Sequence, residues 1–341
     1  MSTNLVIGYF GFKSNKLDGQ TVKTRNFYAL LKELDASARY FDTEEIRYNK
    51  ASILKLLVLI LQAKKIYYLP AHNSLKSFFP WLYKVAKVFN KKIYYFMVGG
   101  WLSDFLTKNT QIKNMLGKIE NVFCETHTIK NELEEKFNFQ NLDYFPNFRE
   151  TYFQPTFRTV DNEHVKIVYM GRINEGKGIL DLFEIEDRLN LLNKNNYSVD
   201  LYGQIQKDFE KELQLRLSLS TKIQYKGVLN PNEIYATLDK YDLMVFPTHF
   251  YTEGLPGTVL DAYLSGIPVL ASDWKHAQEF IEDTKTGFIY EFGSIDKLED
   301  TVAIVLNKPS IINTMKQNAF TKSKSYSKQT AFQILKNIVK Q

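Results

Sequence analysis

Two acidic residues, Glu253 and Asp261, lie eight positions apart, on either side of a Gly/Pro turn that we expect to open a helix. Unpaired N–H groups at a helix start bind anions, helped by about half a positive charge of helix dipole. The backbone at Gly254, Gly257 and Thr258 can therefore hold a diphosphate. Carboxylates repel phosphate, but they accept hydrogen bonds from sugar hydroxyls. Together these residues predict a pocket for a nucleotide sugar.

A second candidate anion site, G-R-I-N-E-G-K-G, runs from Gly171 to Gly178 and follows the apolar run 166–170. We expect a glycine turn between a strand and a helix, where Arg172 and Lys177 add two cations. The spacing G-x-x-x-x-G-K imitates a Walker A loop, but Gly178 stands where Ser or Thr would bind Mg²⁺. A P-loop ATPase is therefore rejected. The alternative for this loop is a surface turn with two solvated cations.

The elements that must position these residues form an α/β pattern, because both halves alternate short apolar runs with amphipathic helical stretches. We expect strands in the first half at 5–10, 38–41, 65–69, 92–97, 121–124 and 142–145. Helices are expected between them at about 22–35, 51–63, 76–89, 102–116 and 128–137. In the second half we expect strands at 165–170, 197–202, 223–225, 243–246, 267–271 and 287–290. The segment 145–156 has two prolines and no periodicity, which favours a linker between two doubly wound parallel sheets.

Composition is that of an ordinary globular protein, with 44% hydrophobic and 24% charged residues over a length of 341 that suggests two domains. The one cysteine, Cys124, excludes an intrachain disulfide and fits a reducing cytoplasm. The first residues lack a basic segment, so we expect no signal peptide. The most apolar stretch, 53–61, contains Lys55 and is far shorter than the roughly 20 residues that span a bilayer. We expect a cytoplasmic protein, soluble or peripheral to the inner face of the plasma membrane.

Charge is spread unevenly along the chain. Residues 1–150 hold 22 Lys and Arg against 14 Asp and Glu, or +8, whereas residues 151–341 hold 22 against 24, or −2. This asymmetry predicts that the first half meets an anionic partner.

The segment 76–92 places aromatic residues beside Lys84, Lys87 and Lys91 at helical spacing. An aromatic face next to a lysine face is typical of a helix that lies on anionic lipid. The alternative is a helix that packs on the core and leaves a solvated lysine edge. Under the first interpretation, changing the three lysines to Glu would abolish binding to anionic vesicles, and unchanged binding would contradict it.

The pair of motifs G-R-x-x-x-x-K-G and E-G-x-P-x-x-x-x-D-A resembles the retaining family-4 glycosyltransferases of GT-B fold. Flanking runs agree, among them Y-G-Q at 202–204, Y-K-G-V-L at 225–229 and Y-D-L-M-V-F-P-T at 241–248. The resemblance is specific over roughly 160–290 and weaker in the first half. It implies two Rossmann-like domains with an interdomain cleft: residues 1–150 for the acceptor and 151–320 for the nucleotide sugar. Residues 321–341 would form a helix that crosses back to the first domain.

The resemblance also implies roles for single residues. Arg172 and Lys177 would bind the donor diphosphate and stabilise the charge on the leaving nucleotide, and Glu253 would hold donor-sugar hydroxyls. Asp261 would accept from the ribose hydroxyls, at a position where most relatives have Glu; the alternative for both acids is ordinary first-turn helix chemistry. Further donor-binding positions are Gly171, Gly203, Gly227, Val228, His249, Gly254, Leu255, Pro256, Gly257 and Thr258. His249 is equally well explained as a surface loop histidine.

On the acceptor side, the loop and helix start over 8–25 resemble the family's site for an anionic acceptor such as a lipid-linked diphosphate. The candidate residues there are Gly19, Gln20, Thr21, Lys23 and Arg25, and the alternative is a solvated basic helix turn. In the loop 95–105 many relatives have a histidine before the glycines, where this chain has Val98. The remaining acceptor-side candidates are Gly99, Gly100, Asp104 and His72. A leaving phosphate can itself take the acceptor proton, so no dedicated base is required.

Other classes of site find little support. The sequence has no C-x-x-C, H-E-x-x-H or D-x-D motif and no nucleic-acid module signature, so we expect no metal, no cofactor and no nucleic-acid partner.

The sequence thus predicts a metal-independent, retaining transferase of hexosyl or N-acetylhexosaminyl type. It would use a UDP-linked nucleotide sugar and a lipid-linked glycan acceptor in capsular, exopolysaccharide or other surface-glycan synthesis. Two alternatives keep the fold: a non-catalytic GT-B homologue that acts as partner or scaffold of an active transferase, and a GT-B-fold epimerase or phosphorylase.

Overall fold

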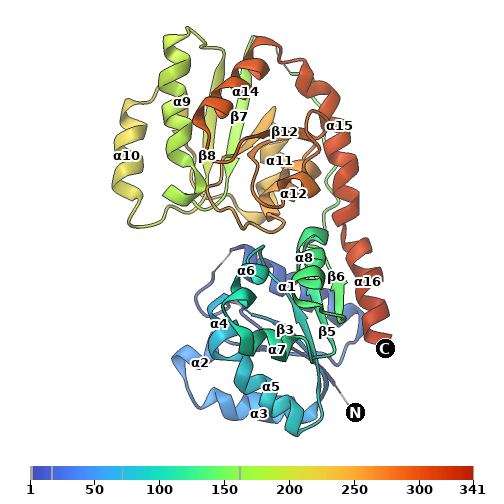
Figure 1. The fold of residues 1–341 in the computed structure, drawn as a ribbon. Helices are drawn as coiled ribbons and strands as arrows, with labels where there is room; N and C mark the ends of the chain where they lie inside the picture. The colour runs from blue at the N-terminus through green and yellow to red at the C-terminus, as the bar shows by residue number, and fades with distance from the viewer. Residues whose placement is uncertain (1–2, 17, 71, 161–162, 341) are drawn as a thin grey trace. The chain divides into compact units, whose positions relative to one another are not determined.

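The computed structural model describes residues 3–16, 18–70, 72–160 and 163–340, which fold as two compact units (Figure 1). Unit 1 comprises Met1–Phe148, Gly254–Pro256 and Ser327–Gln341, and unit 2 comprises Arg149–Glu253 and Gly257–Tyr326. Within the described ranges, no helix has the length and apolar character that crossing a membrane requires.

Unit 1 is built on a six-stranded parallel sheet of order β2-β1-β3-β4-β5-β6. Its strands are β1 (Thr3–Gly8), β2 (Arg39–Asp42), β3 (Ala63–Leu69), β4 (Lys92–Phe96), β5 (Asn121–Cys124) and β6 (Leu142–Tyr144). A parallel sheet is covered on both faces, so its strands are near-continuous apolar runs. The register follows from this burial, with Ile66 of β3 opposite both Leu5 of β1 and Ile93 of β4.

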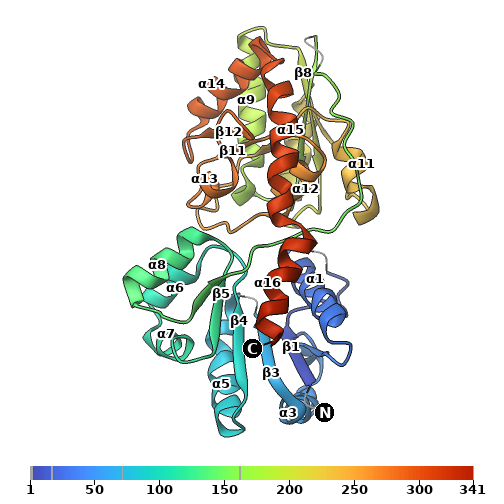
Figure 2. The same ribbon diagram turned by 90° about the vertical axis from the view of Figure 1, so that its right-hand side faces the viewer.

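The helices of unit 1 cover two faces of that sheet. One core cluster joins the sheet to α3 (Ser52–Gln62), α5 (Phe79–Val88), α6 (Leu102–Thr107), α7 (Thr110–Leu116) and α8 (His127–Phe137). A second cluster, which contains Phe27, Phe96 and Leu335, joins it to α1 (Gly19–Leu34) and α16 (Lys328–Lys340). Helices α1 and α16 are neighbours (Figure 2), and Lys328 makes an ion pair with Glu33. Two short helices, α2 (Glu45–Tyr48) and α4 (His72–Ser77), complete the unit.

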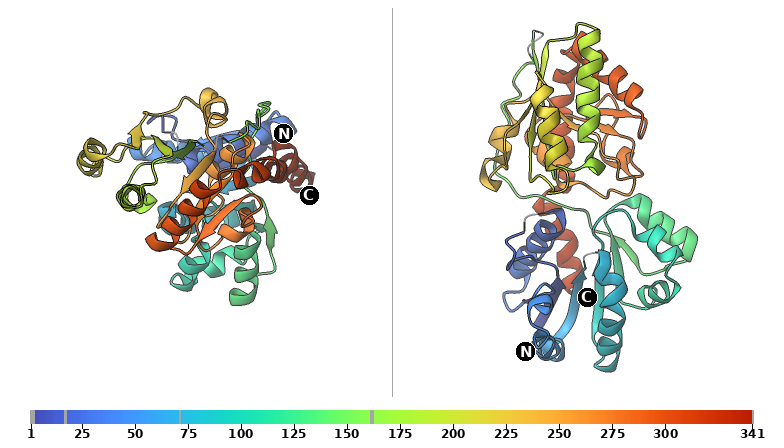
Figure 3. Two further views of the ribbon diagram at one scale, coloured as in Figure 1. Left: turned by 90° about the horizontal axis from the view of Figure 1, so that it is seen from above. Right: turned by 90° about the vertical axis from the view of Figure 1, so that its left-hand side faces the viewer.

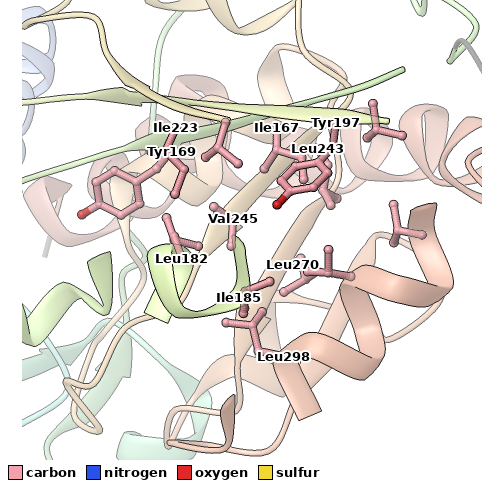
Figure 4. Close-up of a cluster of buried hydrophobic side chains, with 14 of the residues drawn as sticks. Ile167, Tyr169, Leu182, Ile185, Tyr197, Ile223, Leu243, Val245, Leu270 and Leu298 are labelled. Carbon is pink, nitrogen blue, oxygen red and sulfur yellow. The ribbon is translucent and has the colours of Figure 1, made fainter. Parts of the chain in front are cut away.

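Unit 2 has a second six-stranded parallel sheet, of order β12-β11-β10-β7-β8-β9. Its strands are β7 (Val165–Met170), β8 (Tyr197–Tyr202), β9 (Ile223–Tyr225), β10 (Leu243–Phe246), β11 (Val269–Ser272) and β12 (Gly287–Tyr290). Buried side chains from all six of these strands form its core with helix residues such as Leu182, and Figure 4 shows Ile167, Ile223, Val245 and Leu270 among them.

The α-helices of unit 2 are α9 (Ile179–Leu191), α10 (Glu210–Leu219), α11 (Ile234–Leu238), α12 (Gly257–Leu264), α13 (Ala277–Phe280), α14 (Ile295–Asn307) and α15 (Ile311–Ser323). Helices α9 and α10 run side by side (Figure 3) and share a core cluster with α14. Helix α12 packs against α11 and α15. Three 3₁₀ turns, η1 (Glu175–Lys177), η2 (Pro231–Glu233) and η3 (Lys324–Tyr326), link these elements.

The prediction of two doubly wound parallel sheets is confirmed, and a strand occurs at each of the twelve expected places. The single helix expected over 102–116 is wrong, because α6 and α7 are separate. The chain leaves the helical conformation at Asn109, whose φ is −133°. The Asn109 side chain donates to the Phe105 carbonyl at 2.7 Å, which replaces a helix bond at this break.

The helix expected near 76–89 packs on the core. Phe79 and Leu82 of α5 are fully buried, and Phe78, Trp81 and Tyr83 pack against the same cluster. The aromatic face that the sequence offered to a membrane is therefore covered by the sheet and its helices, and the core-packing interpretation of this helix is confirmed.

Candidate functional site

Three glycines that were predicted to bind the donor follow consecutive strands of unit 2. Gly171 directly follows β7, Gly203 directly follows β8 and Gly227 lies two residues past β9. The Gly171 N–H donates to Tyr202 O at 3.0 Å, and the Gly203 N–H donates to Gly227 O at 2.9 Å. A Cβ at Gly203 would lie 1.7 Å from the Gly171 carbonyl oxygen, so only glycine fits there. Ligands of open α/β sheets bind at this carboxyl edge, where Val228 is also exposed.

The loop 171–178, which we call the donor loop, leads from β7 through η1 into α9. Gly178 precedes α9 in the left-handed conformation, with φ of +69°. A Cβ on Gly178 would lie 1.8 Å from the carbonyl oxygen of Pro247, just after β10. At Gly178 the donor loop therefore packs directly against the backbone that follows β10, and this contact leaves no room for a side chain.

We expect Gly178→Ala to lower the free energy of unfolding by about 3 kcal/mol or more, since it combines a strained backbone with a backbone clash. Gly293→Ala is the matched control, because Gly293 has a similar φ of +73° and a Cβ placed there would have no atom of the described residues within 4 Å. The control should lose about 1 kcal/mol. Urea unfolding of both variants measures the difference, and equal losses would contradict the packing described for Gly178.

Two of the three residues predicted to be catalytic meet in unit 2. Lys177 and Glu253 form an ion pair between Nζ and Oε1. The Lys177 side chain is largely buried, and its Nζ lies 5.3 Å from the ring centre of Phe246 and 5.0 Å from that of Phe250. The Thr248 hydroxyl donates to Glu253 Oε1 at 3.4 Å. The ammonium group of Lys177 therefore lies against the rings of Phe246 and Phe250 while it pairs with a carboxylate.

The third residue, Arg172, has an exposed side chain on the same loop, while its carbonyl accepts from the Tyr169 hydroxyl at 2.7 Å. Asn174, two residues further on, is nine-tenths buried, and its Oδ1 has no hydrogen-bond donor among the described residues. The donor loop therefore presents one solvent-facing cation and one unsatisfied acceptor.

His249, predicted to line the donor site, is anchored beside the donor loop. Its Nε2 lies 2.7 Å from Oδ2 of Asp181 in α9, and its N–H donates to the Gly176 carbonyl at 3.0 Å. Burial raises the pKa of Asp181 above its ordinary value, and the contact with His249 offsets part of that rise. Asp181 was not predicted, because nothing in the local sequence distinguishes it from other acids in a first helical turn.

Asp261 is held by a residue that the sequence reasoning missed. Arg149 Nε donates to Asp261 Oδ1 at 2.8 Å, and the Tyr235 hydroxyl lies 3.4 Å from the same oxygen. The arginine lies across the start of α12, where a Cβ on Gly257 would fall 1.8 Å from its Nη2. Thr258 follows Gly257 in α12, and Gly254, Leu255 and Pro256 precede it. If Asp261 binds the ribose hydroxyls as predicted, these hydroxyls must bind a carboxylate that already accepts a hydrogen bond from Arg149.

In unit 1 the structure gives most of the predicted acceptor-side residues local contacts. Gly19 is exposed at the start of α1, and Thr21 forms a capping box with Asp18. Gln20 donates to the Leu69 carbonyl at 3.3 Å. The Arg25 guanidinium donates to the carbonyls of Phe10, Gly11 and Lys16, at 2.8, 3.0 and 3.1 Å. These side chains hold the loop between β1 and α1 in its conformation.

Lys23 is almost completely buried and lies beside a second residue missed from the sequence, Glu125. Lys23 Nζ donates to Glu125 Oε1 at 2.6 Å and to the Met97 carbonyl at 2.8 Å. Glu125 Oε2 accepts from the Gly99 N–H at 2.9 Å. The pair thus fixes the glycine loop after β4 to the end of β5. Gly100 follows in that loop, and Asp104 is exposed on α6. His72 begins α4, but its side chain lies outside the described part of the structure.

A family model described as glycosyl transferases group 1 matches residues 153–322, which contain the donor loop, Glu253 and Asp261. The capsular polysaccharide biosynthesis glycosyltransferase CapM of Staphylococcus aureus is 25% identical over 162 residues, 46% of this chain and 40% of CapM. A 41.2 kDa protein of the cps region of Klebsiella pneumoniae is 22% identical over 169 residues, 48% of this chain and 44% of the relative. The matches therefore span less than half the length of these two curated relatives.

Among solved structures, Anabaena Alr3699/HepE in complex with UDP-glucose superposes with a TM-score of 0.77 at 14% identity, and the whole of both chains is covered. That likeness establishes the fold, two parallel-sheet α/β domains of the GT-B class. Residues 153–322 of this chain form a glycosyl transferases group 1 domain within a GT-B fold.

Proposed function

We propose that the protein is a glycosyltransferase that moves a sugar from a UDP-linked donor to a lipid-linked glycan in capsular, exopolysaccharide or other surface-glycan synthesis. The observation that carries this proposal is the Lys177–Glu253 pair at the carboxyl edge of the unit 2 sheet, inside the matched domain. The name of CapM, which places that relative in capsule synthesis, and the UDP-glucose bound to HepE support the choice of pathway class and donor.

The donor diphosphate would lie against the donor loop. Arg172, exposed on this loop, and Lys177 supply two positive charges, and the N–H groups at the start of α12 supply fixed dipoles. As the bond between the sugar C1 and the phosphate oxygen breaks, negative charge grows on the leaving UDP. Positive groups already in place stabilise that charge without reorganisation. Lys177 has three donors, so it can serve a phosphate oxygen while it stays paired with Glu253.

Glu253 would hold sugar hydroxyls. Asn174 Oδ1 is buried, the described residues give it no donor, and it is therefore suited to accept from a ligand hydroxyl. In a retaining, front-face transfer, the acceptor oxygen bonds to C1 on the face that the phosphate leaves. Its proton passes to the leaving phosphate oxygen, so both bonds and charge balance without a basic side chain. We assign the enzyme to the hexosyl- or N-acetylhexosaminyl-transferring members of family 4, acting at the cytoplasmic face of a membrane.

The test is a transfer assay. The protein is incubated with a panel of UDP-sugars and with lipid-linked diphosphate glycan acceptors, and release of UDP is measured. The proposal predicts acceptor-dependent UDP release with one or a few donors and a product whose anomeric configuration by NMR equals that of the donor. Conversion of the UDP-sugar without acceptor would instead indicate the epimerase alternative.

Chelation should not affect turnover. Within the described residues no three His, Cys, Asp or Glu side chains gather as a metal site, and Arg172 and Lys177 provide the positive charge that a metal would otherwise bring. We therefore expect the rate of UDP release to be the same with excess EDTA as with added Mg²⁺ or Mn²⁺. A rate that falls on chelation and returns with one of these ions would refute metal independence.

A further inference from the structure

Helix α3 buries one face and exposes an apolar stripe on the opposite one. Leu56 and Ile60 are completely buried against the sheet of unit 1. Leu54, Val58 and Leu61, spaced four and three residues apart, form the outward stripe and are 67%, 52% and 48% exposed. Single exposed apolar residues need no explanation, but a stripe along a helix leaves an apolar face unpartnered.

Further apolar side chains are exposed at the C-terminal end of α5. The Lys91 Nζ donates to the Leu61 carbonyl at 2.8 Å, which joins the C-terminal ends of the two helices. Both helices pack on one core cluster of unit 1 (Figure 1). Val88 is 77% exposed, Phe89 is 43% exposed, and Lys84 and Lys87 also face outward. We call Leu54, Val58, Leu61, Val88 and Phe89 the α3–α5 surface.

The sequence that carries this surface is strongly basic. From Ile46 to Ser103 the sequence contains ten Lys and Arg and no Asp or Glu. Two acidic residues from outside this stretch pair with lysines within it, Glu45 with Lys55 and Glu120 with Lys92. Lys84 and Lys87 are exposed, and neither forms an ion pair within the part of the chain that the structure describes.

We propose that the α3–α5 surface rests on an anionic phospholipid bilayer, with Lys84 and Lys87 at the lipid headgroups. Exposed leucine, valine and phenylalanine beside lysine are the composition of interfacial helices. A protein partner is the weaker explanation, since lysine is depleted from protein–protein interfaces. The inference rests on the proposed function only in that a lipid-linked acceptor brings the enzyme to a membrane. It moves the contact from the aromatic face of α5, which is buried, to the outward face of α3.

Co-sedimentation with vesicles tests this proposal, with phosphatidylglycerol-containing and pure phosphatidylcholine vesicles compared at low and high salt. The native protein should bind the anionic vesicles and lose binding as salt rises. Lys84→Gln/Lys87→Gln should weaken the partition coefficient about 30-fold, at about 1 kcal/mol per lysine. Leu54→Ser/Val58→Ser should weaken it about tenfold or more. The matched control is Leu215→Ser/Leu219→Ser in α10 of unit 2, which removes two similarly exposed leucines and should leave binding unchanged.

The outcomes separate this inference from the proposed function. UDP binding, followed as a rise in melting temperature, should be the same in all variants. If the native protein binds UDP but no vesicle, or if the α10 control loses as much binding as the α3 variant, the surface assignment is wrong and the function stands. If it binds vesicles but no nucleotide, the function fails and the surface stands. A salt-insensitive self-association that is abolished by Leu54→Ser/Val58→Ser would overturn the bilayer as occupant in favour of a second copy.

Discussion

Lys177→Ala is expected to lower kcat/KM for sugar transfer by about 100- to 1,000-fold, the usual effect of removing one preorganised group that stabilises developing charge. The lysine is nearly buried, lies against two aromatic rings and is held by Glu253, so its charge is positioned before the donor binds. Lys211→Ala, which removes a lysine from an exposed position on α10, is the control and should keep full activity. Steady-state kinetics with the donor identified by the transfer assay measure both variants.

Substituting Glu253, which pairs with Lys177, should lower kcat without weakening the binding of UDP. Glu253→Gln is expected to reduce kcat about 100-fold or more but to leave UDP affinity within about threefold, because we assign Glu253 to sugar hydroxyls and not to phosphate. Lys177→Ala should weaken UDP binding as well. Glu175→Gln, a change at an exposed acid of the donor loop, controls for the loss of one negative charge. Equal losses of UDP affinity in Lys177→Ala and Glu253→Gln would contradict this division of roles.

Lys23→Met is expected to destabilise unit 1 by about 3–5 kcal/mol, because it leaves the buried Glu125 carboxylate without its cation. The side chains of the pair are 1% and 3% exposed. The double variant Lys23→Met/Glu125→Gln should recover part of the loss, since no unpaired buried charge remains. Lys92→Met breaks an ion pair with Glu120 whose side chains are 43% and 40% exposed, and should cost at most about 1 kcal/mol.

The single cysteine offers a readout for this experiment that is confined to unit 1. Cys124 is fully buried next to Glu125, and burial raises the pKa of its thiol to about 12. It should therefore react with thiol reagents only when unit 1 opens. Faster labelling in Lys23→Met than in Lys92→Met would support the structural role of the pair. Equal labelling and equal urea midpoints would show that the Lys23–Glu125 pair contributes no more than a surface contact.

The strands and the donor loop were predictable because their signals are local. A parallel strand is buried on both faces, so Val165–Met170 or Leu243–Phe246 reads as an apolar run wherever it lies in the fold. The glycines at 171 and 178 and the cations between them lie within eight residues, so the donor loop was recognisable as one motif.

The missed residues belong to ion pairs that only the folded chain brings together. Arg149 lies 112 positions from Asp261, and Lys23 lies 102 positions from Glu125. No period or spacing links such residues. From the sequence, Lys23 was predicted to meet an anionic acceptor or to lie in a solvated helix turn, whereas the fold buries it against Glu125. The sequence of α3 has apolar residues on all sides, so it does not predict which face packs on the sheet. In the structure Leu54 and Val58 lie on the exposed face.

The central claim is that unit 2 binds a nucleotide sugar through the donor loop, and thermal unfolding with a panel of nucleotides and nucleotide sugars tests it most directly. A ligand that binds only the folded protein raises the melting temperature by mass action. The account predicts a rise with UDP and with at least one UDP-sugar in the native protein, a smaller rise in Lys177→Ala and an unchanged rise in Lys211→Ala. No rise with any nucleotide, or an equal rise in the native protein and Lys177→Ala, would contradict it.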